Sequence, residues 1–129
     1  MKELSTNQKN INKKTLKKQV NILELTPVQL LNYEYRQDGQ IDVLVPRFKY
    51  AFFQKMIPKT RSPYIRANLD EIGTVTWELI DGKRKVYEIA DILKERFQDK
   101  INPAYERLSL FIQKMNTNKF ITFIEFMEK

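Results

Sequence analysis

Apolar residues recur with helical spacing in two consecutive segments and predict two helices. In residues 72–80 the apolar side chains cover an arc of about 200° on a helical projection, which indicates a helix buried on most sides. Trp77 falls within that arc and is expected in the core. Residues 86–97 have one apolar face and an opposite face rich in acidic residues. Asp81 and Gly82 separate the two helices, and Gly82 suits a left-handed backbone after the first.

Alternating apolar and polar residues precede these helices and predict three strands. Two runs flank the Asp38-Gly39 pair, which is typical of a type I′ hairpin turn because both central positions need positive φ. Residues 64–69 form the third run. The side chains expected to face the core are those of Ile65, Ala67 and Leu69. Asp70, or Asn68 before it, can cap the helix that follows.

A third helix is predicted to begin at Asn102 and Pro103, with Asn102 as the cap and Pro103 as the first helical residue. Its core stripe consists of Tyr105, Leu108, Phe111, Ile112 and Met115. Leu110 falls outside this stripe. Residues 120–126 are rich in β-forming side chains and predict a last strand or an extended segment packed on the domain.

Two segments lie outside this pattern. Residues 1–29 hold six Lys/Arg and two acids and are expected to form a basic, flexible extension before a domain at 30–129. The apolar stretch that begins at Ile22 can pack on the domain. Residues 47–63 combine aromatic side chains with five Lys/Arg. They are interpreted either as a connection that folds onto the core or as a surface that binds a partner. The net charge of +7 is therefore uneven, and the folded part is expected to be mildly basic.

Composition excludes several kinds of chemistry. The chain has no cysteine and no histidine, which removes zinc ribbons, iron–sulfur clusters, thiol nucleophiles and imidazole catalysis. Capping and turn roles account for Asp70, Glu71 and Asp81, so no catalytic residue, metal or cofactor is expected. No run of about 18 apolar residues and no apolar signal core is present. We therefore expect a cytoplasmic protein that is not an enzyme.

The order of these elements resembles the PqqD family, named after pyrroloquinoline-quinone synthesis protein D. The most specific string is LDEIGTVTWELIDGKRKVYEIADILKERF at residues 69–97, followed by Glu106 and Arg107, and the resemblance covers about residues 31–124. It implies an α+β, winged-helix-like domain in which a three-stranded antiparallel sheet is followed by three helices. In this family Ser or Thr is more usual at the position of Lys85, which predicts a weaker start to the second helix.

The resemblance also implies a non-catalytic peptide chaperone. Such a protein binds the leader segment of a ribosomal precursor peptide and presents the peptide to a maturation enzyme, often a radical S-adenosylmethionine enzyme. The leader adds as a further strand to the third strand, in a groove against the third helix. Carried over by position, the peptide-binding residues are Tyr64, Ile65, Arg66, Ala67, Asn68, Arg107, Leu110, Phe111 and Lys114. The cations Arg66, Arg107 and Lys114 would suit acidic leader residues.

Two other functions stay open at the level of sequence. A winged-helix DNA-binding regulator would use the basic tail and Lys83, Arg84 and Lys85 as phosphate contacts. The acid-rich exposed side of residues 86–97 counts against it, because a helix that reads the major groove presents Arg, Lys, Asn or Gln. The other alternative is a self-associating interaction domain, a homodimer formed through the edge strand or through residues 47–63.

Overall fold

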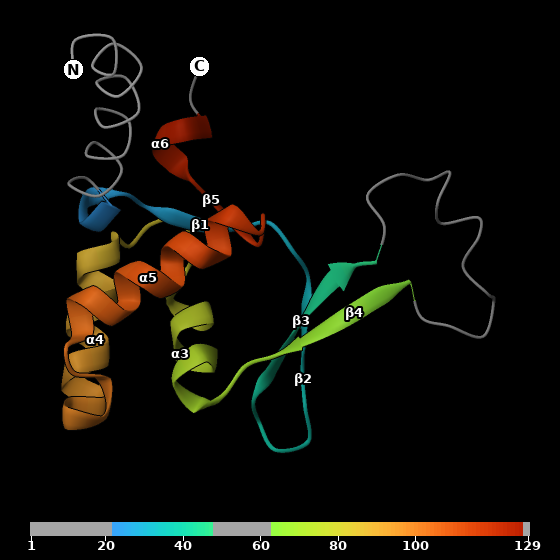
Figure 1. Ribbon diagram of the computed structural model, residues 1–129, viewed down its shortest axis with the longest axis horizontal. Coiled ribbons are helices and arrows are strands. Elements are labelled where there is room, and N and C mark those ends of the chain that lie inside the picture. The colour runs from blue at the N-terminus through green and yellow to red at the C-terminus, as the bar shows by residue number, and fades with distance from the viewer. Residues whose placement is uncertain (1–21, 48–62, 128–129) are drawn as a thin grey trace, which may run out of the picture.

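The computed structural model describes residues 22–47 and 63–127 of the chain. The elements, in chain order, are η1 (Ile22–Glu24), β1 (Pro27–Gln29), β2 (Tyr33–Tyr35), β3 (Ile41–Pro46), β4 (Tyr64–Asn68), α3 (Glu71–Leu79), α4 (Val86–Phe97), η2 (Gln98–Ile101), α5 (Ala104–Thr117), β5 (Ile121–Phe123) and α6 (Ile124–Met127). Figure 1 shows the antiparallel sheet β2-β3-β4 beside a body built from α3, α4 and α5. The predicted α+β class, a three-stranded antiparallel sheet followed by helices in winged-helix-like order, is confirmed.

The β2-β3 hairpin closes with a longer loop than predicted. The N–H of Arg36 donates to Gln40 O at 2.6 Å, and the N–H of Gly39 donates to Arg36 O at 2.9 Å. Positive φ occurs at Gly39, with a value of 87°, and not at Asp38. The predicted type I′ turn is therefore wrong. A three-residue loop that ends in a left-handed glycine gives the hairpin the same twist.

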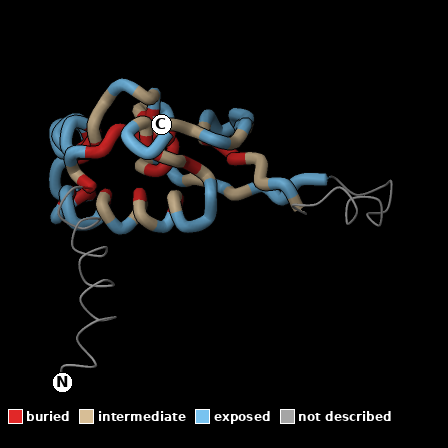
Figure 2. Tube along the Cα trace, turned by 90° about the horizontal axis from the view of Figure 1, so that it is seen from above, coloured by how far each residue is buried: buried red, intermediate tan, exposed pale blue. Residues whose placement is uncertain are grey.

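Helix α3 begins as predicted, with Asp70 as its cap. The Asp70 carboxylate accepts the N–H of Gly73 at 2.7 Å. Trp77 is 0% exposed, which confirms its place in the core. Buried residues concentrate in the helical body, whereas the far end of the sheet is exposed (Figure 2). Ile65 lies on the same face of the sheet as Ala67, as predicted, but it is 48% exposed and is not part of the core.

Helix α4 begins after Lys85 without a side-chain cap, as predicted, whereas the start of α5 differs from the prediction. Lys85 is the cap residue of α4, and its side chain has no acceptor for the helix N–H groups. The Glu88 carboxylate instead accepts the Lys85 N–H at 2.8 Å, which satisfies one half of a capping box. At α5 the cap position is Pro103 and the first helical residue is Ala104, one residue later than predicted.

Residues 22–29, expected as the end of the N-terminal extension, pack on the helical body. Ile22 and Leu25 are buried, and β1 pairs antiparallel with β5. Thr26 donates both its N–H and its hydroxyl to the Glu125 carboxylate, each at 2.8 Å. We therefore propose that the domain begins at Ile22, while residues 1–21 and 48–62 lie outside the described part. The last strand predicted for residues 120–126 is confirmed at Ile121–Phe123, whereas Ile124–Met127 form the short helix α6 instead.

The positive charge of the chain is not carried by the described residues. They hold 12 Lys/Arg and 14 Asp/Glu, a net charge of −2, whereas the whole chain carries +7. The expectation of a mildly basic folded part is therefore wrong for these residues. Any attraction to an anionic partner has to come from a local arrangement of cations rather than from their overall charge.

Candidate functional site

Strand β4 lies at one edge of the described sheet, with β3 as its partner. In an antiparallel pair, the backbone groups of successive residues point alternately towards the partner strand and away from it. The N–H of Leu69 donates to Ile41 O at 2.9 Å, so Ala67, two residues earlier, also pairs with β3. The backbone N–H and C=O of Arg66 and Asn68 therefore point outward, at an edge that another strand can join.

The side chains of Arg66 and Asn68 lie on the face of the sheet that carries Asp42. The guanidinium of Arg66 is 2.6 Å from Glu34 Oε1 and 3.4 Å from Asp42 Oδ2. Hydrogen bonds from Arg36, at 2.8 Å, and from Asn68 lower the pKa of Asp42 although burial opposes them. The charge of Arg66 is thus already shared with two carboxylates of the same sheet.

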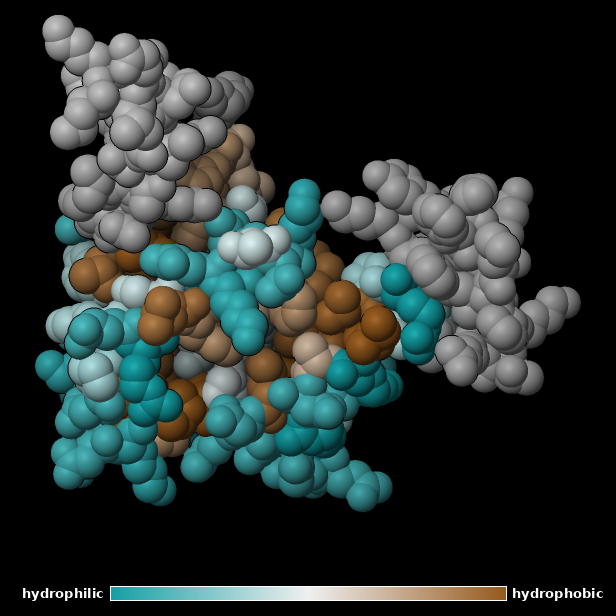
Figure 3. Space-filling model, viewed as in Figure 1, coloured by the Kyte–Doolittle hydropathy of each residue, from teal (hydrophilic) through white to brown (hydrophobic). Residues whose placement is uncertain are grey.

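The other face of the sheet is apolar. Tyr33, Val43 and Ala67 stand in register across its three strands. Tyr33 contacts Trp77 of α3 edge to face, with ring centroids 6.2 Å apart. Ile65 continues this surface towards the exposed end of the sheet. Hydrophobic side chains gather in the region between α5 and the sheet (Figure 3).

A pocket of about 230 Å³ opens between α3 and α5, close to the end of β4. Its apolar wall is formed by Ile72, Leu93, Ile101, Leu108 and Phe111. Asp70 and Arg107 also line it. Asp70 stands two residues after the last residue of β4, so the pocket lies close to the end of that strand. Arg107, Leu108 and Phe111 place the third helix of the body on the other side of the pocket.

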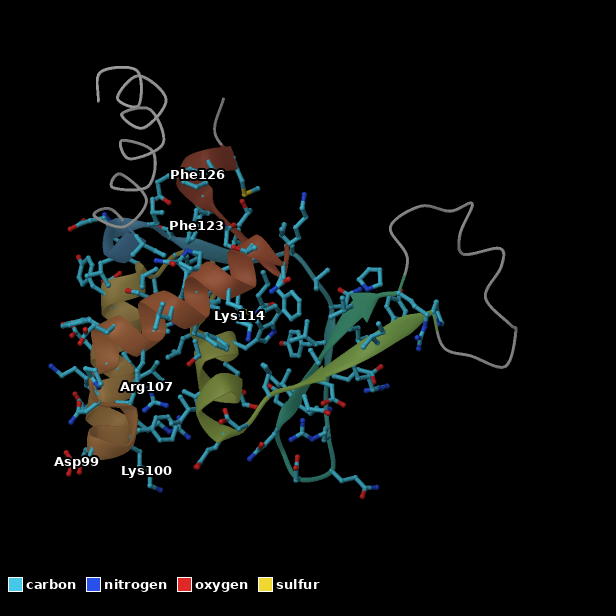
Figure 4. All side chains as sticks on the ribbon, viewed as in Figure 1. Asp99, Lys100, Arg107, Lys114, Phe123 and Phe126 are labelled. Atoms are coloured by element: carbon cyan, nitrogen blue, oxygen red, sulfur yellow. The ribbon has the colours of Figure 1, made fainter. Side chains whose placement is uncertain are left out.

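Helix α5 presents an exposed leucine and two cations. Leu110 is 66% exposed, more than any other large hydrophobic residue that the structure describes. Arg107 donates through Nη1 to Lys100 O at 2.5 Å. Arg107 and Lys114 both extend from α5 (Figure 4), and neither forms an ion pair with a carboxylate in residues 22–47 or 63–127. These two cations are thus available to an acidic ligand.

The predicted site residues divide into two groups. Arg107 and Phe111 meet at the pocket, and Leu110 and Lys114 are exposed on the same helix. The strand residues form the edge itself: Tyr64 is 40% exposed and Ala67 is half-buried against the core. Their part in peptide binding stays a prediction.

Sequence reasoning assigned Ile72 to the core and gave no role to Ile101. Ile72 is half-buried and lines the pocket. Ile101 belongs to η2, a short element that has no periodic pattern to reveal it. Only the packing of η2 against α4 brings Ile101 into the pocket wall.

Two of the three turn cations that a DNA-binding function would use already form ion pairs. Arg84 is 2.8 Å from Asp81, and Lys85 is 3.8 Å from Glu24.

Within the described ranges, no group of three or more carboxylates is placed to hold a metal ion. Every helix in those ranges is too short or too polar to cross a membrane.

Comparison with known proteins gives one match. The family model described as coenzyme PQQ synthesis protein D (PqqD) matches residues 64–121, the region from β4 to the start of β5. Searches of curated proteins and of solved structures found no significant match. The matched region contains the open strand edge, the pocket and every predicted site residue.

Proposed function

Because residues 64–121 are a PqqD-family region, we propose that the chain is a peptide-binding partner protein in the biosynthesis of a cofactor or modified peptide. In the finer form of the proposal, it binds the leader segment of a ribosomal precursor by strand addition and presents the peptide to a maturation enzyme, such as a radical S-adenosylmethionine enzyme. The chain itself supplies no catalytic step.

The observation that carries this proposal is the open edge of β4. The backbone groups of Arg66 and Asn68 point away from β3, and the β3-β4 pairing leaves them available. An extended peptide joined there gains a ladder of backbone hydrogen bonds, which supplies affinity without regard to sequence. The apolar surface and the α5 side chains then supply selectivity.

A proline at residue 66 tests strand addition. The Arg66 N–H points outward, so Arg66→Pro removes a donor to the added peptide without removing a β3-β4 hydrogen bond. Arg66→Ala removes the same side chain and its ion pairs but keeps the N–H, and it serves as the matched control. Binding of the leader segment of a candidate precursor peptide is measured by isothermal titration with the full chain.

We expect Arg66→Ala to bind the leader and Arg66→Pro to lose at least about tenfold in affinity, because one buried backbone hydrogen bond is left unmade. Leu110→Glu should also weaken binding by placing a charge beside the apolar surface. Equal affinity of the alanine and proline variants, with both folded by circular dichroism, would show that the peptide does not join β4.

The same edge can join a second copy of the chain, which is the alternative of self-association. Light scattering at the concentrations of the titration separates the two. A monomer that binds the leader supports the proposal. A wild-type dimer that does not bind the leader, and that becomes a monomer in the Arg66→Pro variant, favours the self-associating domain.

A further inference from the structure

The pocket between α3 and α5 has the size and lining to hold one large apolar side chain. Its volume of about 230 Å³ exceeds the roughly 150 Å³ of an apolar cavity that binds benzene. Leu93 and Leu108 at its wall are buried, whereas Ile72 and Phe111 are half-buried. Half-buried apolar walls lose further water when a phenyl or branched aliphatic group fills the space.

Arg107 brings a positive charge to the lining of this pocket. Its Nη1 donates to the neutral carbonyl of Lys100, which orients the guanidinium without neutralising it. The remaining guanidinium donors can take a carboxylate in a bidentate arrangement. Asp70 also lines the pocket, but its Oδ1 accepts the Gly73 N–H as the cap of α3.

The position of the pocket relative to β4 decides which ligand reaches it. Asp70 follows Asn68 by two residues, so a peptide paired along the edge of β4 arrives at the pocket when it passes the end of the strand. There a side chain can enter between α3 and α5, and a neighbouring side chain comes within reach of Arg107.

We propose that the peptide carries a large apolar residue next to an acidic residue, and that this pair fixes its register. The apolar side chain fills the pocket lined by Ile72, Ile101 and Phe111. The adjacent carboxylate pairs with Arg107. This inference rests on the proposed function, because it assumes a peptide along β4, and it adds the class of sequence that the peptide carries.

The test uses defined peptides rather than the natural leader. The probe is a short, acetylated and amidated fluorescent peptide of threonine and valine with one central Phe-Glu pair, and fluorescence anisotropy measures its affinity for the full chain. In matched peptides, alanine replaces Phe, or glutamine or lysine replaces Glu. Replacing Phe should weaken binding about tenfold or more, and replacing Glu by Gln about two- to fivefold.

Protein variants assign these losses to named groups. Arg107→Glu should reverse the preference, so that the Phe-Lys peptide binds better than the Phe-Glu peptide. Lys83→Glu, the same charge reversal at an exposed lysine in the turn between α3 and α4, should keep the wild-type order. Ile72→Trp should occupy the pocket and reduce the difference between the Phe and Ala peptides.

The outcomes separate this inference from the proposed function. If the peptides bind, depend on the Arg66→Pro change, and show no preference for Phe or Glu, strand addition stands and the pocket proposal is overturned. The same holds if Arg107→Glu keeps the preference for Phe-Glu. If binding ignores the Arg66→Pro change altogether, the proposed function itself is overturned.

Discussion

The side chain of Asn68, at the end of β4, donates to the carboxylate of Asp42, directly opposite on β3, over 2.5 Å. The same carboxylate lies 2.8 Å from Arg36 and 3.4 Å from Arg66. One buried acid thus gathers three donors and ties β4 to β3 from the sheet face. The outer edge of β4 takes no part in this network, so the strand is held firmly and its edge stays open.

Asp42→Asn should lower the urea midpoint of unfolding, because it removes the charge that these donors share and leaves a guanidinium nitrogen without its partner. Asp38→Asn is the matched control. Asp38 pairs with the same Arg36 at 3.2 Å, but its side chain is 57% exposed, so the effect should be smaller. Equal midpoints for both variants would show that Asp42 does not hold the sheet together.

Stability should fall in acid, starting below about pH 4.5. Hydrogen bonds from Arg36 lower the pKa of Asp42 below its ordinary value of 3.8. Burial raises the pKa of Glu125, but hydrogen bonds from Thr26 outweigh this effect and hold the pKa of Glu125 below its ordinary value of 4.5. The folded state therefore binds these protons less readily than the unfolded chain, and stability is lost as the pH falls through the lowered values. Urea midpoints measured against pH should show this decline, and Glu125→Gln should reduce it. A midpoint that rises on acidification would contradict the assignment.

The hydroxyl of Tyr35 should lose its proton at a higher pH than an ordinary tyrosine. Its hydroxyl donates to Glu78 at 2.7 Å, and this bond raises the pKa of Tyr35 from 10.0 to about 12. Its contribution to stability is present below pH 10 and is lost as the pH rises towards 12. Ultraviolet difference titration of the phenolate, with Tyr35→Phe to identify the signal, should show its pKa falling towards 10.0 in Glu78→Gln. An unchanged titration in that variant would refute the pairing.

The proposed start of the domain at Ile22 can be tested by truncation. Removal of residues 1–21 should leave the urea midpoint unchanged, whereas removal of residues 1–29 also deletes β1 and four buried residues and should unfold the domain. Leu25→Ala alone should cost about 2–5 kcal/mol, as expected for a large apolar residue in a core. If the longer truncation is as stable as the shorter one, the domain begins later in the chain.

Local signals in the sequence were sufficient for most of the fold. Helical spacing located α3 and α4, and alternation located β3 and β4, because the spacing of apolar residues is a local property of each element. The cap at Asp70 is a local interaction within three residues and was equally visible. The length of the hairpin loop could not be predicted, because the Asp-Gly pair is compatible with more than one loop length. The register of the flanking strands selects among these lengths.

The candidate site was only partly visible in sequence. Leu110 stood out because it leaves the core stripe of its helix, and it is indeed exposed. The pairing of Arg66 with Glu34 depends on which residues face each other across β2, β3 and β4, and no local pattern fixes that register. The strand β1 was missed for the same reason: its partner β5 lies at the other end of the chain.

The most direct test of the central claim is the hydrogen-exchange rate of the Arg66 amide, measured by nuclear magnetic resonance with and without the leader peptide. The Ala67 amide, which pairs with β3, is the internal control. Strand addition predicts that Arg66 exchanges fast in the free protein and becomes protected when the leader binds, while Ala67 is protected in both states. Leader binding that leaves the exchange of the Arg66 amide unchanged would contradict the proposal that the peptide joins β4.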